Sequence, residues 1–165
     1  MANNQIDTLN QEIGLSADAN QFLTFTLGEE EYGVDILKVQ EIKGYVPTTR
    51  IPNAPSDVTG VLNLRGTIVP IVDLRRKFNL DMTEYDQFTC IVVVVVQNRV
   101  MGMIVDSVSE VMNIPPSDIQ PPPDFGNGFG SSMLRGMAKV GEKLIILLDI
   151  DTVLLGESAG MAYAA

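Results

Sequence analysis

Residues 60–74 read GVLNLRGTIVPIVDL, a stretch in which two apolar runs flank one basic residue. Arg65 follows the first run, and Gly66 behind it can take backbone angles that other residues avoid. The second run is an apolar strand ending at Asp73, which is placed to N-cap a following helix, DLRRKF. An enzyme would use such an arginine as an anion clamp, whereas a binding protein would use it as the fixed point of an apolar surface.

This stretch has a counterpart later in the chain, so the sequence contains an internal repeat. Three pairs of short segments match at offsets of 70 to 76 residues. They are Leu64-Arg65-Gly66 with Leu134-Arg135-Gly136, the strand ending at Asp73 with LIILLDI and its Asp149, and Val34-Asp35 with Val105-Asp106. Asp149, like Asp73, is placed to N-cap a helix, DIDTVLL.

Hydrophobic periodicity places further elements around the repeat. Leu23, Phe25 and Leu27 alternate with threonines, which is the period-two pattern of a half-buried strand. After a turn over 28–33 a strand resumes and runs into LKVQEI, which we expect to be a short helix. The second half has the same order: strand FTCIVVVVV, a turn at 97–99, strand VMGMIV and a short helical stretch, DSVSEVM.

The repeat predicts a mainly β protein made of two similar units, 21–85 and 86–156, each of about five short strands. Neither unit buries enough surface alone, so the two should pack on each other and leave a groove at the seam. Residues 1–20 are expected to be a disordered N-terminal tail, and 157–165 a flexible C-terminal tail. Pro- and Gly-rich loops fall in matching places before each LRG and are expected to carry binding residues.

Composition narrows the classes of partner. The chain has 165 residues, 11 Lys and Arg against 21 Asp and Glu, and a net charge of −10, which disfavours nucleic acid and anionic lipid surfaces. Its longest apolar run, Cys90–Val96, is far shorter than the ~20 residues that span a bilayer. The first residues lack the basic and apolar regions of a signal peptide. We therefore expect a cytoplasmic protein that does not insert into membranes.

The residues that usually carry enzymatic chemistry are scarce. The sequence contains no His, which removes the commonest general base and metal ligand. Cys90 is expected to be a buried strand residue, and Asp149 and Asp151 to be helix caps rather than a metal pair. The run 75–77, Arg-Arg-Lys, could bind an acidic partner, but a solvated helix face is the favoured interpretation. No catalytic, cofactor or metal site is predicted.

Arg65 requires a carboxylate or water around its charge, and Glu41 is the natural partner within the same half. One interpretation is an ion pair that fixes the short helix 37–42 against the barrel. The other is that Glu41 and Arg65 line a recognition groove together with Ile36, Val39 and later apolar residues. The residues alone leave both interpretations open.

Three segments closely resemble the bacterial chemotaxis coupling proteins of the CheW family. They are QFLTFTLGEEEYGVDILKVQEIKGY, GVLNLRGTIVPIVDLRRKF and RVMGMIVDSVSEV. The resemblance covers nearly all of 21–155 and implies two intertwined SH3-like five-stranded barrels, that is, one CheW-like domain over 21–156. It also implies a non-enzymatic adaptor, without cofactors, that links transmembrane chemoreceptors to the histidine kinase CheA at the inner face of the membrane through receptor arrays.

The resemblance further implies where the partners bind. The cytoplasmic tip of a chemoreceptor would lie in the groove between the barrels, and the barrel ends would meet the regulatory domain of the kinase. Glu41 and Arg65 would matter for receptor and kinase control, and Ile36 and Val39 would supply apolar contact. Gly60 and Gly102 would sit where a side chain disturbs an interface or a turn. Arg135 carries less weight, because the second LRG is less regular in the family.

Three alternatives remain beside the adaptor. One is a small-molecule-binding or catalytic β-barrel protein that uses the groove as a pocket, which a ligand-induced rise in melting temperature would support. The second is a family member that serves a non-flagellar chemosensory pathway. The third is the receptor-binding part of a longer hybrid adaptor, which the length of this chain disfavours.

Overall fold

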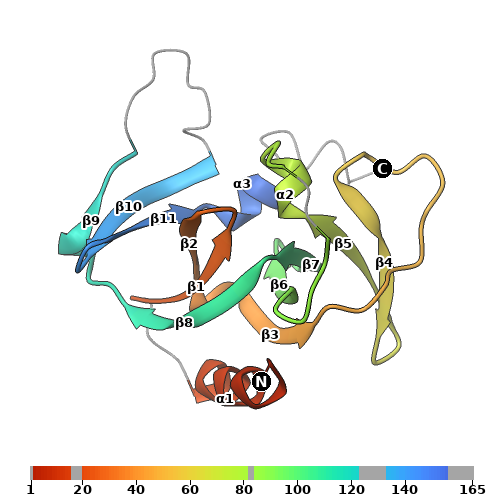
Figure 1. Ribbon diagram of the computed structural model, residues 1–165, viewed down its shortest axis with the longest axis horizontal. Coiled ribbons are helices and arrows are strands. Elements are labelled where there is room, and N and C mark those ends of the chain that lie inside the picture. Colours follow the sequence, from red (N-terminus) through yellow and green to blue (C-terminus); the bar gives the residue numbers. More distant parts are fainter. Residues whose placement is uncertain (1, 16–19, 82–83, 123–132, 156–165) are drawn as a thin grey trace.

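The computed structural model describes residues 2–15, 20–81, 84–122 and 133–155, which form two packed β-sheets and a few short helices (Figure 1). The first sheet has the strand order β8-β1-β2-β11-β10-β9, and the second β3-β6-β7-β5-β4. The mainly β fold predicted from the sequence is confirmed. Part of the Pro- and Gly-rich loop predicted before the second LRG, 123–132, lies outside the described residues. The predicted C-terminal tail, 157–165, also lies outside them.

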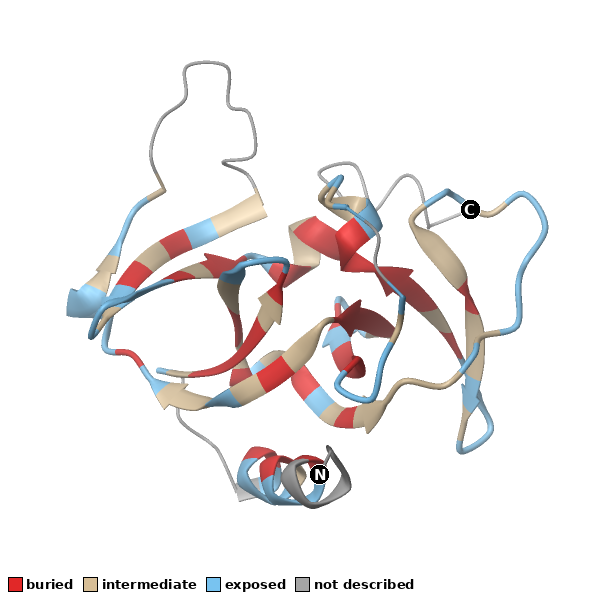
Figure 2. Ribbon diagram, in the orientation of Figure 1, coloured by how far each residue is buried: buried red, intermediate tan, exposed pale blue. Residues whose placement is uncertain are grey.

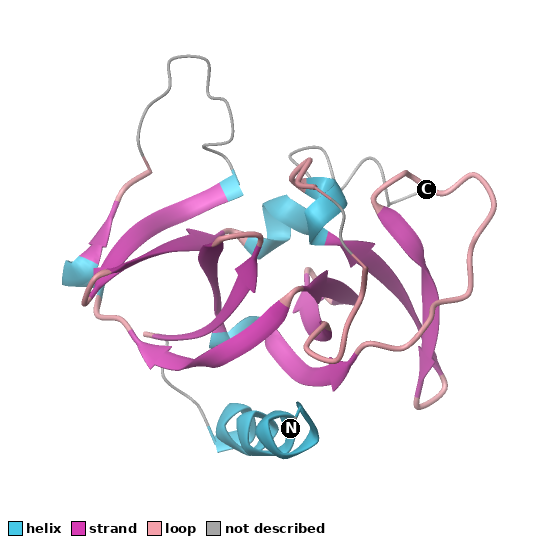
Figure 3. Cartoon of the chain, in the orientation of Figure 1, coloured by secondary structure: helices cyan, strands magenta, loops and turns pink. Residues whose placement is uncertain are grey.

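The strands of the first sheet are β1 (Gln21–Leu27), β2 (Glu30–Asp35), β8 (Ser107–Asn113), β9 (Ile119–Gln120), β10 (Leu134–Val140) and β11 (Lys143–Leu148). Those of the second sheet are β3 (Val39–Gly44), β4 (Val58–Leu64), β5 (Thr67–Asp73), β6 (Cys90–Val96) and β7 (Arg99–Val105). The helices are α1 (Ala2–Leu15), α2 (Leu74–Lys77) and α3 (Ile150–Leu155), with 3-10 turns η1 (Ile36–Lys38) and η2 (Pro116–Asp118) (Figure 3).

Each half of the chain contributes strands to both sheets. The β1–β2 hairpin lies in the first sheet, but β3, the next strand, pairs with β6 of the second. The β6–β7 hairpin lies in the second sheet, and β8 crosses back to pair with β1. The repeat is therefore visible in the topology, but the predicted contiguous units 21–85 and 86–156 do not correspond to the two sheets, because the first two strands of each half lie in one sheet and the remaining strands of that half lie in the other.

The core has three clusters that follow this arrangement (Figure 2). One lies inside the barrel of the first sheet, around Phe22 and Ile145, and one inside the barrel of the second, around Ile71 and Val93. The largest joins the two barrels. Strand β6, CIVVVVV, supplies side chains both to the cluster inside the second barrel and to the cluster that joins the barrels. Nearly all of the strand is therefore buried, as its unbroken β-branched run requires.

Two segments were predicted to be short helices, and both predictions are wrong for the same reason. LKVQEI forms the end of η1 and the start of β3, and DSVSEVM lies almost wholly in β8. Each strand has a register shift, at Gln40 in β3 and at Ser109 in β8. Such a bulge brings apolar residues three apart onto one face, and that spacing resembles a helix in the sequence.

The N-terminal segment differs from the predicted disordered tail. Residues 2–15 form α1, which packs across β3 and β8 with Ile6, Leu9 and Ile13 buried (Figure 1). The side chain of Asn10 bonds both backbone groups of Ile42, accepting from its N–H at 2.8 Å and donating to its carbonyl at 3.0 Å. An edge strand is thereby covered, and the spacing of the buried side chains by three and then four residues is the helical signal that the polar composition concealed.

The two helices predicted after the repeated aspartates are confirmed. Asp73 accepts a hydrogen bond from the backbone N–H of Arg75 at 2.9 Å and caps α2. Asp149 accepts from the N–H of Thr152 at 3.5 Å at the start of α3. Asp151, which was also expected to be a cap, instead pairs with Lys38 at 3.3 Å.

Candidate functional site

Arg65 lies in the two-residue turn that joins β4 to β5. Its φ of +52° is in the left-handed region, as is that of Gly66 at +86°. The Gly66 N–H donates to Asn63 Oδ1 at 2.9 Å, which closes the turn. Glycine and asparagine are the usual residues of such turns, so an arginine here is not explained by turn formation.

Glu41 follows the bulge in β3, at the opposite edge of the same sheet. Arg65 Nη1 lies 2.5 Å from Glu41 Oε2, and this hydrogen bond and the charge of Glu41 raise the pKa of the guanidinium. Because β3 and β4 are the two edge strands of the second sheet, the pair joins its edges across the barrel. The predicted Glu41–Arg65 pair is present, although Glu41 lies on a strand rather than on a helix.

The two charged side chains differ greatly in exposure. The Arg65 side chain is 74% exposed and that of Glu41 is 20% exposed, so the cation is the part presented to solvent. Exposed apolar side chains lie on neighbouring elements: Ile68 on β5, Leu37 on η1 and Val95 on β6. This combination of one held cation and scattered apolar side chains suits recognition of a protein surface.

Ile36 and Val39 do not supply this apolar surface. Both are buried in the cluster that joins the two barrels, at 2% and 7% exposure, so neither side chain is presented at the surface of this chain. The side chain that this segment exposes is Leu37, between them. The bulge and the 3-10 turn invert the expected pattern, and no feature of the sequence reveals that inversion.

Gly60 and Gly102 are required by close packing inside the second barrel. Gly60 has φ +152°, and a Cβ there would meet the carbonyl oxygen of Thr49 at 2.2 Å, where a short β-bridge joins Thr49 to Val61. A Cβ on Gly102 would meet Ile71 Cδ1 at 2.5 Å. Both glycines therefore shape the barrel that carries Arg65, and neither presents a contact surface of its own.

A buried ionic cluster lies where the barrels meet, and the sequence analysis missed it. Arg75, expected on a solvated helix face, is 2% exposed; its Nε lies 3.5 Å from Asp73 and its Nη1 3.3 Å from Asp106. Tyr85 lies under the guanidinium, 4.8 Å from ring centre to Cζ, and donates to Asp73 at 2.6 Å. Burial, and then this hydrogen bond, raise the pKa of Tyr85 to about 12.

The cluster also ties the two sheets together. Asp106 follows β7 of the second sheet, and its Oδ2 accepts from the backbone N–H of Gly28, in the β1–β2 turn of the first, at 2.8 Å. The available sequence signal was the pair of parallel strands β5 and β7, each of which ends in an apolar run followed by an aspartate. In the structure both aspartates lie at the same edge of the second sheet, where they share the cation Arg75.

The second LRG motif is not equivalent to the first. Leu134, Arg135 and Gly136 begin β10, whereas the turn that corresponds to Arg65-Gly66 is Gly141-Glu142, between β10 and β11. Arg135 pairs with Asp35 at 3.2 Å and lies 5.4 Å from the ring centre of Phe22. The matching offset is 76 residues throughout the hairpin, which places Gly136 where Gly60 lies in the other barrel.

The described residues offer little for catalysis. Cys90 is buried in β6, as predicted, and burial raises the pKa of its thiol to about 11. Within these residues no three or more His, Cys, Asp or Glu side chains are grouped as metal ligands. None of the described helices has the length and apolar character needed to cross a membrane.

The chain is similar to known proteins over most of its length. Residues 21–157 match the model of the CheW-like domain. The chain is 47% identical to the chemotaxis protein CheW of Klebsiella aerogenes over 141 residues, 86% of this chain and 85% of that protein. It is 36% identical to that of Rhizobium meliloti over 143 residues, 87% and 92% of the two chains.

A solved structure is also similar. The scaffolding protein TtCheW from Thermoanaerobacter tengcongensis superposes with a TM-score of 0.76 at 33% identity, covering 82% of this chain and 92% of that chain. The likeness therefore extends over most of both chains.

Proposed function

This chain belongs to the CheW-like family, and from that premise we propose that it is a non-enzymatic scaffold of bacterial chemotaxis signalling. The observation that carries the proposal is the 47% identity to a chemotaxis protein CheW across 86% of the chain. Its partners would be the cytoplasmic tips of chemoreceptors and the regulatory domain of the histidine kinase CheA. It would act in the cytoplasm, at the inner face of the membrane, through receptor arrays.

Such a scaffold works by holding two proteins in a fixed relation, which needs rigid surfaces rather than reactive groups. The intertwined barrels and the buried ion cluster between them supply the rigidity. Each contact with a partner can be weak, because an array raises the effective concentration of every component. Transmission of a receptor signal would then depend on how firmly the scaffold holds its geometry.

Within this scaffold, Arg65 is the residue proposed to contact a partner. Its side chain is exposed on a tight turn, and Glu41 fixes the direction of its guanidinium. An arginine held in this way loses less conformational entropy on binding than a free one. Ile36, Val39, Gly60 and Gly102 would affect binding indirectly, because they hold β3 and β4 in place beneath the pair.

The experiment is reconstitution of a ternary complex from this protein, a soluble chemoreceptor signalling fragment and the kinase. We expect the wild-type protein to sediment with both partners and to raise kinase activity above that of receptor and kinase alone. Arg65→Ala should remain folded and lose the activation. If the wild-type protein binds neither partner, the proposed function is wrong.

A further inference from the structure

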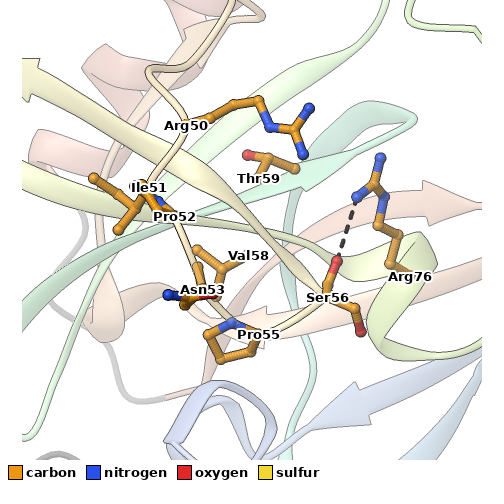
Figure 4. A pocket seen from close by; sticks show the side chains of 10 residues that line it. Arg50, Ile51, Pro52, Asn53, Pro55, Ser56, Val58, Thr59 and Arg76 are labelled. Atoms are coloured by element: carbon orange, nitrogen blue, oxygen red, sulfur yellow. Dashed lines mark hydrogen bonds between the residues drawn. The ribbon is translucent and has the colours of Figure 1, made fainter.

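A groove beside α2 is lined by cations and not by carboxylates. Two adjoining cavities of about 500 and 290 Å³ share Arg50, Val58, Thr59 and Arg76 in their walls. In Figure 4 the side chains of Arg50, from the loop before β4, and Arg76, from α2, extend towards each other on either side of Thr59. No residue lining either cavity is an Asp or Glu, although the chain has nearly twice as many acidic as basic residues.

The two arginines keep unused donors. The salt bridges found among the described residues include neither of them. Arg76 Nη1 donates to the carbonyl oxygen of Ser56 at 3.3 Å, which leaves its charge uncompensated. The acidic residue in the same loop, Asp57, is held by Lys77 at 3.4 Å. Each guanidinium can therefore still donate two parallel hydrogen bonds to a carboxylate, the geometry that arginine favours.

A third cavity provides the contrast. It lies against the first sheet and is also lined by charged residues, Asp35, Lys38 and Arg135 among them. There each cation has an internal partner: Lys38 pairs with Asp151 and Arg135 with Asp35. Among these three cavities of the described residues, the two beside α2 are the ones whose positive charge is available to a ligand.

The walls of the groove are held in place before any ligand binds. Thr48 Oγ1 donates to the carbonyl of Thr59 at 3.1 Å, and the Val58 N–H donates to the carbonyl of Pro55 at 3.0 Å. The bridge between Thr49 and Val61 fixes the loop to β4. A site that is already formed spends little binding energy on ordering its own side chains and backbone.

We infer that this groove binds an acidic segment of a protein partner, with a carboxylate between Arg50 and Arg76. Ile51 is 46% exposed, and Pro52, Ala54 and Pro55 line the same cavity, so an apolar side chain next to the carboxylate would be buried as well. This mixed wall favours a peptide segment over a small free anion. The inference deepens the proposed function and rests on it, since the segment would belong to the receptor or to the kinase.

The test measures the affinity of the receptor signalling fragment and of the kinase regulatory domain, each separately, by titration calorimetry. Arg50→Glu and Arg76→Glu should each weaken binding of the same partner by about tenfold. Lys139→Glu is the matched control, because it makes the same change in charge at an exposed position of β10, and it should leave both affinities unchanged. If the arginine variants bind both partners as Lys139→Glu does, the inference is overturned.

A second measurement stands apart from the proposed partners. Wild-type protein labelled with ¹⁵N is titrated with the blocked peptide Leu-Asp-Glu-Leu, with its amide counterpart Leu-Asn-Gln-Leu, and with inorganic phosphate. The acidic peptide alone should shift the amide signals of Thr48 and Thr59. Equal shifts with the amide peptide, no shifts with any ligand, or shifts with phosphate only would each contradict an acidic-segment site. If the acidic peptide alone shifts these signals but the ternary complex with receptor and kinase does not form, the proposed function is refuted and the acidic-segment site is not.

Discussion

The turns β4–β5 and β10–β11 occupy equivalent places in the two barrels but carry different residues. Both turns begin in the left-handed region, Arg65 at φ +52° and Gly141 at φ +63°. Both strands opposite, β3 and β8, have a bulge followed by a glutamate, Glu41 or Glu110. The barrel with Gly141 has the residue that the backbone favours. The backbone of these turns therefore favours glycine, and the arginine of the second barrel is proposed to act through its side chain.

The two barrels also differ in the ion pairs next to the helix that follows each hairpin. In the second barrel the cation comes from α2, and Arg75 is buried between Asp73 and Asp106. The corresponding residue of α3 is Asp151, and the cations come instead from Lys38 and Arg135, whose side chains are 41% and 45% exposed. The second barrel is therefore fixed by a buried cluster, whereas the first is held by ion pairs at the surface.

The largest expected effect comes from this difference in burial. Arg75→Met should lower the free energy of unfolding by about 3–5 kcal/mol, because Asp73 then remains buried without its cation. Arg135→Met should cost less than about 1 kcal/mol, since exposed pairs contribute little. Urea unfolding of both variants measures the comparison. Equal losses would show that the two ionic groups are alike in energy.

A smaller difference is expected between the equivalent glycines of β4 and β10. Gly60→Ala should cost about 2–3 kcal/mol, because its φ of +152° and the Thr49 carbonyl both oppose a side chain. Gly136→Ala should cost about 1–2 kcal/mol, because its Cβ would meet Ile119 Cγ2 at 2.6 Å and the Gln120 carbonyl oxygen at 2.7 Å, but its φ lies outside the left-handed region. Urea unfolding midpoints give the ranking, and the reverse order would contradict it.

Removal of the α1 anchor should have a local effect. Asn10→Ala deletes both hydrogen bonds to Ile42 and should lower stability by about 1 kcal/mol. The measurement is amide hydrogen exchange. In the variant we expect faster exchange at the Ile42 amide, on β3, and a smaller change in β8. An unaltered Ile42 amide in the variant would mean that α1 does not protect this edge.

High pH should weaken the cluster gradually. Folding raises the pKa of Tyr85 from 10.0 to about 12, so its neutral phenol is the form that stabilises the fold. That contribution is complete below pH 10 and is lost as the pH rises towards 12. Tyr85→Phe should remove this part of the pH dependence, which chemical unfolding at several pH values would detect. If the stability of Tyr85→Phe fell with rising pH in the same way as that of the wild-type protein, Tyr85 would not be the cause of the decline.

The smallest effect on stability is expected at Arg65. Arg65→Gly reproduces the turn residue of the other barrel, so the free energy of unfolding should be unchanged or slightly higher despite the lost ion pair. The same variant should fail to activate the kinase in the reconstituted complex. A large loss of stability would instead make Arg65 a structural residue.

Much of the fold could be predicted because β-branched runs, a repeat and capping aspartates are local signals. The Glu41–Arg65 pair was also predictable, since Arg65 interrupts an apolar stretch and Glu41 is the natural carboxylate partner within the same half. Burial of Val39 and Arg75 was not, because a bulge and an exchanged strand decide which face each residue occupies. Such features depend on contacts between segments far apart in the sequence, which residue spacing does not encode.

The most direct measurement is a charge exchange at the pair, Glu41→Arg combined with Arg65→Glu, assayed for stability and for kinase activation with the receptor fragment. The exchange restores the internal ion pair but presents an anion where the partner would meet a cation. We predict that the double variant regains the stability of the wild-type protein and does not activate the kinase. If the double variant restores activation, the pair serves only to close the barrel, and Arg65 is not a partner contact.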